Sequence, residues 1–253
     1  MEIVDEWTST SPDGEWIAAG MVAFPGKGTD NPLANVRLVV SRVDGETVWT
    51  VIDEFQETGL GFPMPEPHRW SQDGKSFYFT HRVVPDGCSV FAYRVDLYRV
   101  DLEDGTVDEL LPPYVQTLAL SPDESQIAFI GFGERGLALK NLATGEERET
   151  GIDPGKSFNA GHLLWSPDGK AFAFTLAIDP CSGTFDEGRS FWAESTSILW
   201  MDAETLGRRT LLEEDPRLLV IHEWKENDVV TLMGEDENDL WEMDVETGEI
   251  VNK

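Results

Sequence analysis

Short runs of alternating apolar residues, each preceded by a polar turn, recur along the whole chain. After the turn, apolar side chains stand at every second position, as in the pairs Ile17 and Ala19, Phe77 and Phe79, Ile127 and Phe129, and Phe172 and Phe174. A spacing of two is the period of a β-strand and not of a helix. The residue between the members of each pair is also uncharged, which is typical of strands covered on both faces. The pattern therefore predicts an all-β protein whose sheets are packed on both sides.

A turn of the type Ser-Pro-Asp-Gly introduces these strands. Its clearest copy lies in residues 164–175, LWSPDGKAFAFT. Proline presets the φ angle of the first central residue, aspartate bonds its own backbone two positions on, and glycine takes the positive φ that closes the turn. Two strands that leave such a turn must be antiparallel. Further copies lie in residues 11–19, 70–79, 120–129 and 224–232, of which the last keeps little more than the Trp and the polar turn.

A second repeated motif follows each turn and predicts two more strands. Residues 96–105 (DLYRVDLEDG) match residues 239–248 (DLWEMDVETG), and weaker copies lie in residues 36–45, 136–145 and 198–207. Each copy is a strand that ends in a polar residue and a turn closed by glycine, with a short strand after it. One repeat is therefore expected to form four antiparallel strands.

The spacing of the five turns is that of β-propeller repeats. The turn residues Asp13, Asp73, Asp123, Asp168 and Asn227 are about 45 to 60 positions apart, the length of a propeller blade with some enlarged loops. The Trp-Ser-Pro-Asp-Gly turn with its following strand resembles the TolB-like family of β-propeller repeats, which are relatives of the WD-repeat propellers.

This resemblance covers nearly the whole chain and implies an all-β fold, a single propeller domain of residues 1–253 with five blades of four antiparallel strands. The blades are expected at about residues 1–56, 57–111, 112–153, 154–214 and 215–253. The resemblance also implies a non-catalytic binding or scaffold module that takes a protein or peptide partner, although propellers host many functions.

The charge of the chain limits its partners. There are 48 acidic and 19 basic residues, for a net charge of −29. Such a surface repels phosphate backbones and anionic lipid, which argues against nucleic acid binding and membrane insertion. High solubility of an exported or salt-adapted protein explains the charge, and a cation or a basic partner is the alternative explanation.

The sequence contains no signal peptide and no apolar run of membrane-spanning length. Because Met1 directly precedes a strand-like segment, we expect an extracytoplasmic protein, periplasmic or secreted, whose export signal is outside this sequence. A cytoplasmic location is the alternative, and we expect a monomer.

The usual motifs for cofactors and nucleophilic catalysis are missing. Residues 131–136 (GFGERG) formally match the dinucleotide fingerprint, but a strand follows them where a helix is needed, and residues 26–29 (GKGT) lack the spacing of a phosphate loop. The sequence has no Gly-x-Ser-x-Gly, His-Glu-x-x-His or Cys-x-x-Cys. We therefore predict no cofactor and assign no catalytic residue.

Three of the four histidines occupy related places in the repeats. His68 and His222 stand two residues before the Trp of the repeat, and His162 stands three before it. These positions begin inner strands, which line the channel mouth of a propeller, where three imidazoles would be able to bind a divalent cation. Against this, the offset of one residue turns His162 to the opposite face of its strand. Metal binding is therefore the alternative to histidines with a structural role.

The binding surface is expected on the loop side of the blades, at the channel mouth. Its candidate residues are His68, Arg82, Tyr114, Asn159, His162, Arg189, Trp192 and His222. Arg189 and Trp192 belong to the long insertion of blade four, residues 177–192, which also contains Phe185 and Phe191. Loops carry function more often than the scaffold does, but such aromatic side chains also serve as a local cover of the blade edge.

The two cysteines lie in matching loops between the second and third strands of their blades. A disulfide between Cys88 and Cys181 requires these loops to lean across the intervening blade. Two buried thiols are the equally acceptable alternative.

A glycan-active hydrolase is the second functional class, since five-bladed propellers also serve as scaffolds for glycosidases with inward-facing carboxylates. This chemistry needs two carboxyl groups about 5 to 10 Å apart. The inner-strand candidates are Asp5, Glu6, Glu66 and Glu223, and their flanking residues do not resemble glycosidase motifs.

Overall fold

Strands and turns make up the described part of the computed structural model. It describes residues 2–24, 33–57, 59, 62–83, 91, 93–94, 96–131, 136–151, 158–178, 195–225, 228–234 and 238–253. No helix among these residues is long and apolar enough to cross a membrane.

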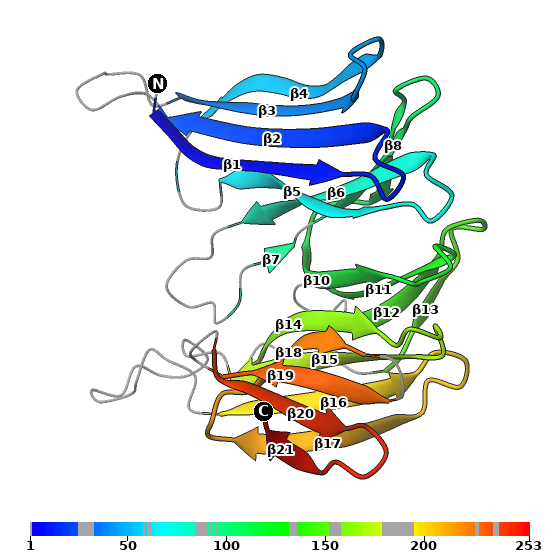
Figure 1. Cartoon of the computed structure of the whole chain (residues 1–253). Helices are drawn as coiled ribbons and strands as arrows, with labels where there is room; N and C mark the ends of the chain where they lie inside the picture. Colours follow the sequence, from blue (N-terminus) through cyan, green and yellow to red (C-terminus); the bar gives the residue numbers. More distant parts are fainter. Residues whose placement is uncertain are drawn as a thin grey trace. The chain divides into compact units, whose positions relative to one another are not determined.

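The described strands form five antiparallel sheets, each built of consecutive strands (Figure 1). The first sheet contains β1 (Glu2–Thr10), β2 (Trp16–Phe24), β3 (Leu33–Arg42) and β4 (Val48–Glu57). The second contains β5 (Pro63–Trp70), β6 (Ser76–Val83), β8 (Leu97–Asp101) and β9 (Val107–Leu111), and also includes the two-residue strand β7 (Tyr93–Arg94). The third contains β10 (Val115–Leu120), β11 (Gln126–Gly131), β12 (Leu137–Asn141) and β13 (Glu147–Glu149).

The fourth sheet contains β14 (Phe158–Trp165), β15 (Ala171–Ile178), β16 (Thr196–Asp202) and β17 (Arg208–Asp215). The fifth contains β18 (Val220–Trp224), β19 (Val229–Met233), β20 (Leu240–Asp244) and β21 (Ile250–Asn252). The prediction of five sets of four antiparallel strands is therefore confirmed.

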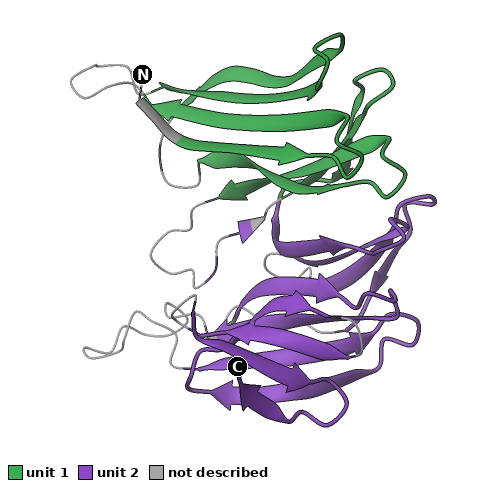
Figure 2. Ribbon diagram, viewed as in Figure 1, with its two compact units in different colours: residues 1–84, 94–113 green, residues 85–93, 114–253 purple. Residues whose placement is uncertain are grey.

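The chain divides into two compact units (Figure 2). Unit 1 comprises residues 1–84 and 94–113, with the first and second sheets, and unit 2 comprises residues 85–93 and 114–253, with the other three. That residues 1–253 form a single domain stays a prediction.

The Ser-Pro-Asp-Gly turns join the first two strands of their sheets as predicted. In the fourth sheet, the Ser166 hydroxyl donates to Asp168 Oδ1 at 2.8 Å and accepts the N–H of Ala171 at 3.0 Å. Gly169 takes a φ of 70°, as the turn requires. Serine and aspartate make the same bond in the other turns, between Ser11 and Asp13, Ser71 and Asp73, and Ser121 and Asp123. The serine thus closes the turn and holds the aspartate that organises it.

Acid is expected to weaken these turns. Lys170, followed by Ser166, lowers the pKa of Asp168 to about 2. A serine hydroxyl likewise lowers the pKa of the equivalent carboxyls, Asp13, Asp73 and Asp123. A carboxyl whose pKa is depressed in the folded state stabilises the fold above its unfolded pKa, and this contribution is lost as the pH falls through the folded value. We therefore expect the urea midpoint of unfolding to fall between about pH 4 and pH 2.

The variant Asp168→Asn is expected to show a shallower fall over the same pH window, because one of the titrating groups is gone. An unfolding midpoint that stays constant from pH 4 to pH 2 in the wild-type chain would contradict the role of these carboxyls.

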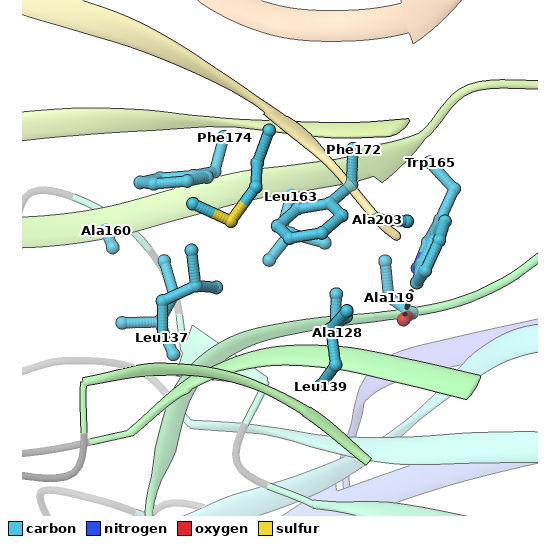
Figure 3. Close-up of a cluster of buried hydrophobic side chains, with 12 residues drawn as sticks. Ala119, Ala128, Leu137, Leu139, Ala160, Leu163, Trp165, Phe172, Phe174 and Ala203 are labelled. Carbon is cyan, nitrogen blue, oxygen red and sulfur yellow. Dashed lines mark hydrogen bonds between the residues drawn. The ribbon is translucent and has the colours of Figure 1, made fainter. Parts of the chain in front are cut away.

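A buried cluster between the third and fourth sheets forms part of the core of unit 2 (Figure 3). Its aromatic members Phe172, Phe174 and Trp165 pack with aliphatic residues of β12, among them Leu137 and Leu139. The indole N–H of Trp165 donates to the carbonyl of Ala119 in β10 at 2.9 Å. The repeated Trp therefore fastens the first strand of its own sheet to the first strand of the sheet before it.

The same fastening occurs in unit 1, where the indole N–H of Trp70 donates to the Ser9 hydroxyl of β1 at 2.9 Å. The third sheet carries Leu120 at this position and the first carries Thr10. In the fifth sheet, the buried indole N–H of Trp224 has no hydrogen-bond partner among the described residues. The Trp of the repeat therefore bonds the preceding sheet at Trp70 and Trp165, whereas at Trp224 it is buried without a described hydrogen-bond partner.

Candidate functional site

A β-bulge interrupts the first strand of each of the five described sheets. The pairing register shifts at one place in β1, β5, β10, β14 and β18. The residues placed there are Val4, His68, Gln116, His162 with Leu163, and His222. Bulges bend a strand, re-aim the side chains that they carry and are frequent next to functional sites. The feature shared by the three histidines is therefore the bulge of their strand.

The bulge in β14 contains two residues opposite one residue of β15, since Gly161 pairs with Thr175 and Leu164 with Ala173. Strict alternation of side chains does not hold across such a bulge. The offset of His162 therefore gives no information about the face on which this histidine lies, and the sequence-based argument from alternation does not apply.

Tyr114 introduces the first strand of unit 2 in a strained conformation. Its backbone has a φ of 103°, and its side chain is 75% exposed. A bulky residue with positive φ is a true outlier, and such strain is concentrated at functional sites. The sequence-predicted binding residue Tyr114 is thus an exposed aromatic side chain in a conformation that costs free energy.

Two buried side chains fix the backbone of β14 and β18 near their bulges. Gln116 Oε1 of β10 accepts the N–H of Ala160 at 2.8 Å, and Thr175 Oγ1 of β15 accepts the N–H of Ile221 at 3.2 Å. In both cases an acceptor from the preceding sheet binds the chain just before the bulged histidine. The bulges are therefore held by neighbouring sheets, which favours defined positions for the side chains that they present.

His162 is exposed, and its ring packs edge-on against Phe91 with 5.4 Å between the ring centroids. Phe91 also lies over Gly161, so closely that a Cβ atom there would be 2.6 Å from its ring. The absence of a side chain at Gly161 is therefore required for the contact that supports His162.

Asn159 is buried and accepts a hydrogen bond from the Tyr93 hydroxyl at 2.9 Å. This predicted binding residue therefore orients another side chain. His222, by contrast, is exposed on β18 next to the exposed Glu223.

In unit 1, the predicted residue Arg82 is held by two carboxylates of first strands. Its Nη2 lies 3.2 Å from Asp5 Oδ2 of β1, and its Nε lies 3.9 Å from Glu66 Oε1 of β5. All three side chains are about one-third exposed. Asp5 and Glu66, two of the carboxylates considered for glycan chemistry, therefore both lie within ion-pair distance of the Arg82 guanidinium. His68 lies in the same sheet as Glu66 and is half-buried.

A histidine–aspartate pair in the second sheet was not anticipated from the sequence. Asp96 Oδ2 lies 2.8 Å from His81 Nδ1, and Asp96 Oδ1 accepts the backbone N–H of His81 at 2.7 Å. The two side chains are only 5% and 15% exposed. The carboxylate favours a proton on Nδ1, which leaves Nε2 as the acceptor. This is how imidazoles are oriented when they act as bases or metal ligands.

The surroundings of His81 are aromatic. Its ring packs edge-on against Phe79 and Tyr98, which stack on each other with centroids 5.1 Å apart. Burial, followed by the charges of Asp96 and Glu109, raises the pKa of Tyr98 to about 12, so that its hydroxyl stays protonated at neutral pH. His81 and Asp96 are close together because β6 pairs with β8. The only sequence signal for this contact is that His81 lies near the end of β6 and Asp96 directly before the start of β8.

Within the described residues, no group of three or more His, Cys, Asp or Glu side chains is arranged to hold a metal ion. His68 belongs to unit 1, whereas His162 and His222 belong to unit 2. The predicted residues Arg189 and Trp192 lie outside the described residues, as do Cys88 and Cys181, the two residues of the disulfide considered above.

No protein-family model matches this sequence, and no curated protein matches it either. Solved structures are similar in fold. The β-propeller domain of the Trilobed protease from Pyrococcus furiosus has a TM-score of 0.55 and 13% identity, covering 98% of this chain and 71% of its own. An oligogalacturonate lyase in complex with manganese has a TM-score of 0.51 and 13% identity, covering 99% and 84%.

TolB from Acinetobacter baumannii is also among the similar structures, with a TM-score of 0.47 and 16% identity. The match covers 98% of this chain, which spans 54% of the TolB chain. The Pyrococcus furiosus domain confirms the predicted β-propeller fold. At these identities the likeness concerns the fold alone, and the TolB-like relationship remains a resemblance.

Proposed function

We propose that this chain is a binding propeller that takes a protein or peptide partner through Tyr114, His162 and His222, which we name the bulge surface. The proposal is based on three exposed side chains. Tyr114 directly precedes β10, and His162 and His222 lie in the bulges of β14 and β18. These strands follow one another in unit 2, where β14 contacts both β10 and β18. A partner is therefore offered side chains from three neighbouring sheets.

The chemistry of the bulge surface suits a polypeptide ligand. Tyrosine gives a large, rigid contact area with a polar end, and it is enriched among the residues that dominate binding energy. Histidine adds hydrogen-bonding groups. The buried partners Gln116 and Thr175 hold the backbone of the bulges, so little ordering has to accompany binding.

The net charge of −29 favours basic or neutral partners over acidic ones. We also propose that the protein is a monomer in an extracytoplasmic compartment, periplasmic or secreted. The proposal includes neither nucleic acid binding nor membrane insertion.

The candidate carboxylates of the glycan-active alternative are Asp5, Glu6, Glu66 and Glu223. Asp5 and Glu66 are both engaged by Arg82. One of the similar structures is an oligogalacturonate lyase, but at 13% identity this likeness concerns the fold. Binding is therefore the function that the geometry favours.

A peptide-display selection tests the proposal. A library of random peptides is selected on the wild-type chain, and the affinities of enriched peptides are measured for the variant Tyr114→Ala/His162→Ala/His222→Ala. We expect binding to weaken by at least about tenfold, because exposed aromatic anchors contribute most of the energy of such contacts.

The control variant Phe55→Ala/Val107→Ala also removes exposed apolar side chains, in this case from β4 and β9 of unit 1. Its affinities are expected to match those of the wild-type chain. Peptides that bind the bulge-surface variant as tightly as the wild type would refute the proposed site.

A further inference from the structure

A small pocket of about 200 Å³ opens on the fourth sheet, beside the end of β15, the start of β16 and the second half of β17. Its lining residues are Leu176, Ser195, Ser197, Leu199, Thr210, Glu213 and Glu214. This set contains two apolar side chains, three hydroxyls and two carboxylates, and none of its members belongs to the bulge surface.

Irregular pairing between β16 and β17 creates the rim of the pocket. Thr196 pairs with Asp215 and Ile198 pairs with Leu212, so that Glu213 and Glu214 together lie opposite Ser197. The Ser197 hydroxyl accepts the backbone N–H of Glu214 at 3.0 Å, and Glu214 has a φ of 46°. Consecutive residues of a regular strand point to opposite faces. The bulge therefore allows two adjacent glutamates to border the same pocket.

Leu176 and Leu199 form the apolar part of the pocket. They are partly buried and pack against the cluster that contains Phe172, Phe174 and Trp165 (Figure 3). The apolar side of the pocket is therefore backed by the rigid core of unit 2, while the carboxylates lie on its exposed side.

The two carboxylates of the pocket favour a cationic ligand. No ion pair to Glu213 or Glu214 is found among the described residues. Ionised carboxylates only accept hydrogen bonds, and hydroxyls accept them readily. A ligand with several N–H donors and a positive charge complements the two carboxylates, and an apolar stem fits against the two leucines.

A primary ammonium on an alkyl chain meets all of these requirements. It has three donors and no acceptor, and its methylene groups pack along apolar surface while the charge stays near water. The volume of about 200 Å³ is below that of pockets for drug-sized ligands but sufficient for one flexible side chain. The net charge of −29 raises the local concentration of such cations.

We propose that this pocket binds a primary alkylammonium group, supplied by a lysine side chain of a partner or by a free alkyl diamine. The site is independent of the bulge surface, so the variant Tyr114→Ala/His162→Ala/His222→Ala keeps it.

Titrations of the full chain followed by amide NMR test the site. The probes are Nα-acetyl-lysine N-methylamide, 1,5-diaminopentane and, without the charge, Nα-acetyl-norleucine N-methylamide. We expect saturable shifts of the amides of residues 195–199 and 210–215 with the two ammonium probes and none with the norleucine probe. Tighter binding of the lysine probe identifies a polypeptide source, and tighter binding of the diamine identifies a free amine.

The variant Glu213→Gln/Glu214→Gln is expected to weaken the binding of both ammonium probes by at least about tenfold. The control Glu46→Gln/Glu57→Gln changes the net charge equally at exposed positions of the first sheet and is expected to bind like the wild type. Equal weakening in both variants would indicate a general effect of charge, and shifts that do not saturate would also overturn the proposal. So would equal binding of the norleucine probe.

Discussion

The variant Trp165→Ala is expected to lower the free energy of unfolding by about 3 to 5 kcal/mol. Trp165 is buried, packs against Phe172 with 5.3 Å between ring centroids, and donates its indole N–H to the carbonyl of Ala119. Its removal leaves a cavity between the third and fourth sheets and breaks a hydrogen bond that links them. Urea unfolding of the full chain, followed by far-ultraviolet circular dichroism, measures the loss.

Phenylalanine substitutions separate the hydrogen bond from the packing. Trp165→Phe loses the bond to Ala119, whereas Trp224→Phe removes a buried indole N–H that has no partner among the described residues. Both tryptophans end the first strand of their sheet and are equally buried. We expect Trp165→Phe to cost about 1 to 3 kcal/mol more than Trp224→Phe. Equal costs would contradict the fastening role of the Trp165 indole.

The variant Asp96→Ala is expected to destabilise the chain by about 3 kcal/mol, since charge-assisted hydrogen bonds are among the strongest. Asp96 is buried, and it binds both the backbone N–H and the ring of His81. Equilibrium unfolding in urea gives the change in free energy. Nitrogen NMR of the imidazole gives a second readout, because the proton is expected to move from Nδ1 toward Nε2 when the carboxylate is removed.

Asp108→Ala is the matched control in the same sheet. Asp108 pairs with Arg99 at 2.6 Å, but both side chains are more than one-third exposed. Exposed pairs contribute little, so we expect a cost of at most about 1 kcal/mol. If both variants cost the same, or if the tautomer of His81 is unchanged in Asp96→Ala, then Asp96 does not position the ring.

Local patterns explain why the sheets could be predicted from the sequence. A turn such as Ser166–Gly169 is determined by local residues, since Ser166 and Asp168 bond each other and the backbone just after the turn, and the glycine takes the positive φ. The uncharged run after the turn then predicts a strand that is buried on both faces, as residues 171–175 are. The five sheets and their strand order follow from repeating this unit.

The site could be predicted only in part, because its geometry depends on contacts between distant residues. The histidines at 68, 162 and 222 were recognisable from their distance to the Trp, but a bulge adds one residue without leaving a mark in the apolar pattern. Asn159, one of the predicted binding residues, accepts a hydrogen bond from Tyr93, which is 66 positions away. Neither that bond nor the pairing of His81 with Asp96 has a local signature.

The role of the repeated Trp shows the same limit. As a marker, it identifies three of the five repeats, at Trp70, Trp165 and Trp224. Its hydrogen bond to the preceding sheet in two cases, and the lack of a described partner for Trp224, depend on the sheet against which each Trp packs.

Hydrogen–deuterium exchange of the full chain with and without a selected peptide tests the bulge surface most directly. The proposal predicts that the bound peptide slows exchange in residues 114–118, 159–163 and 220–224, while the strands of unit 1 exchange as before. Protection confined to unit 1, or to the outer strands β13, β17 and β21, would contradict a binding site at the bulged first strands.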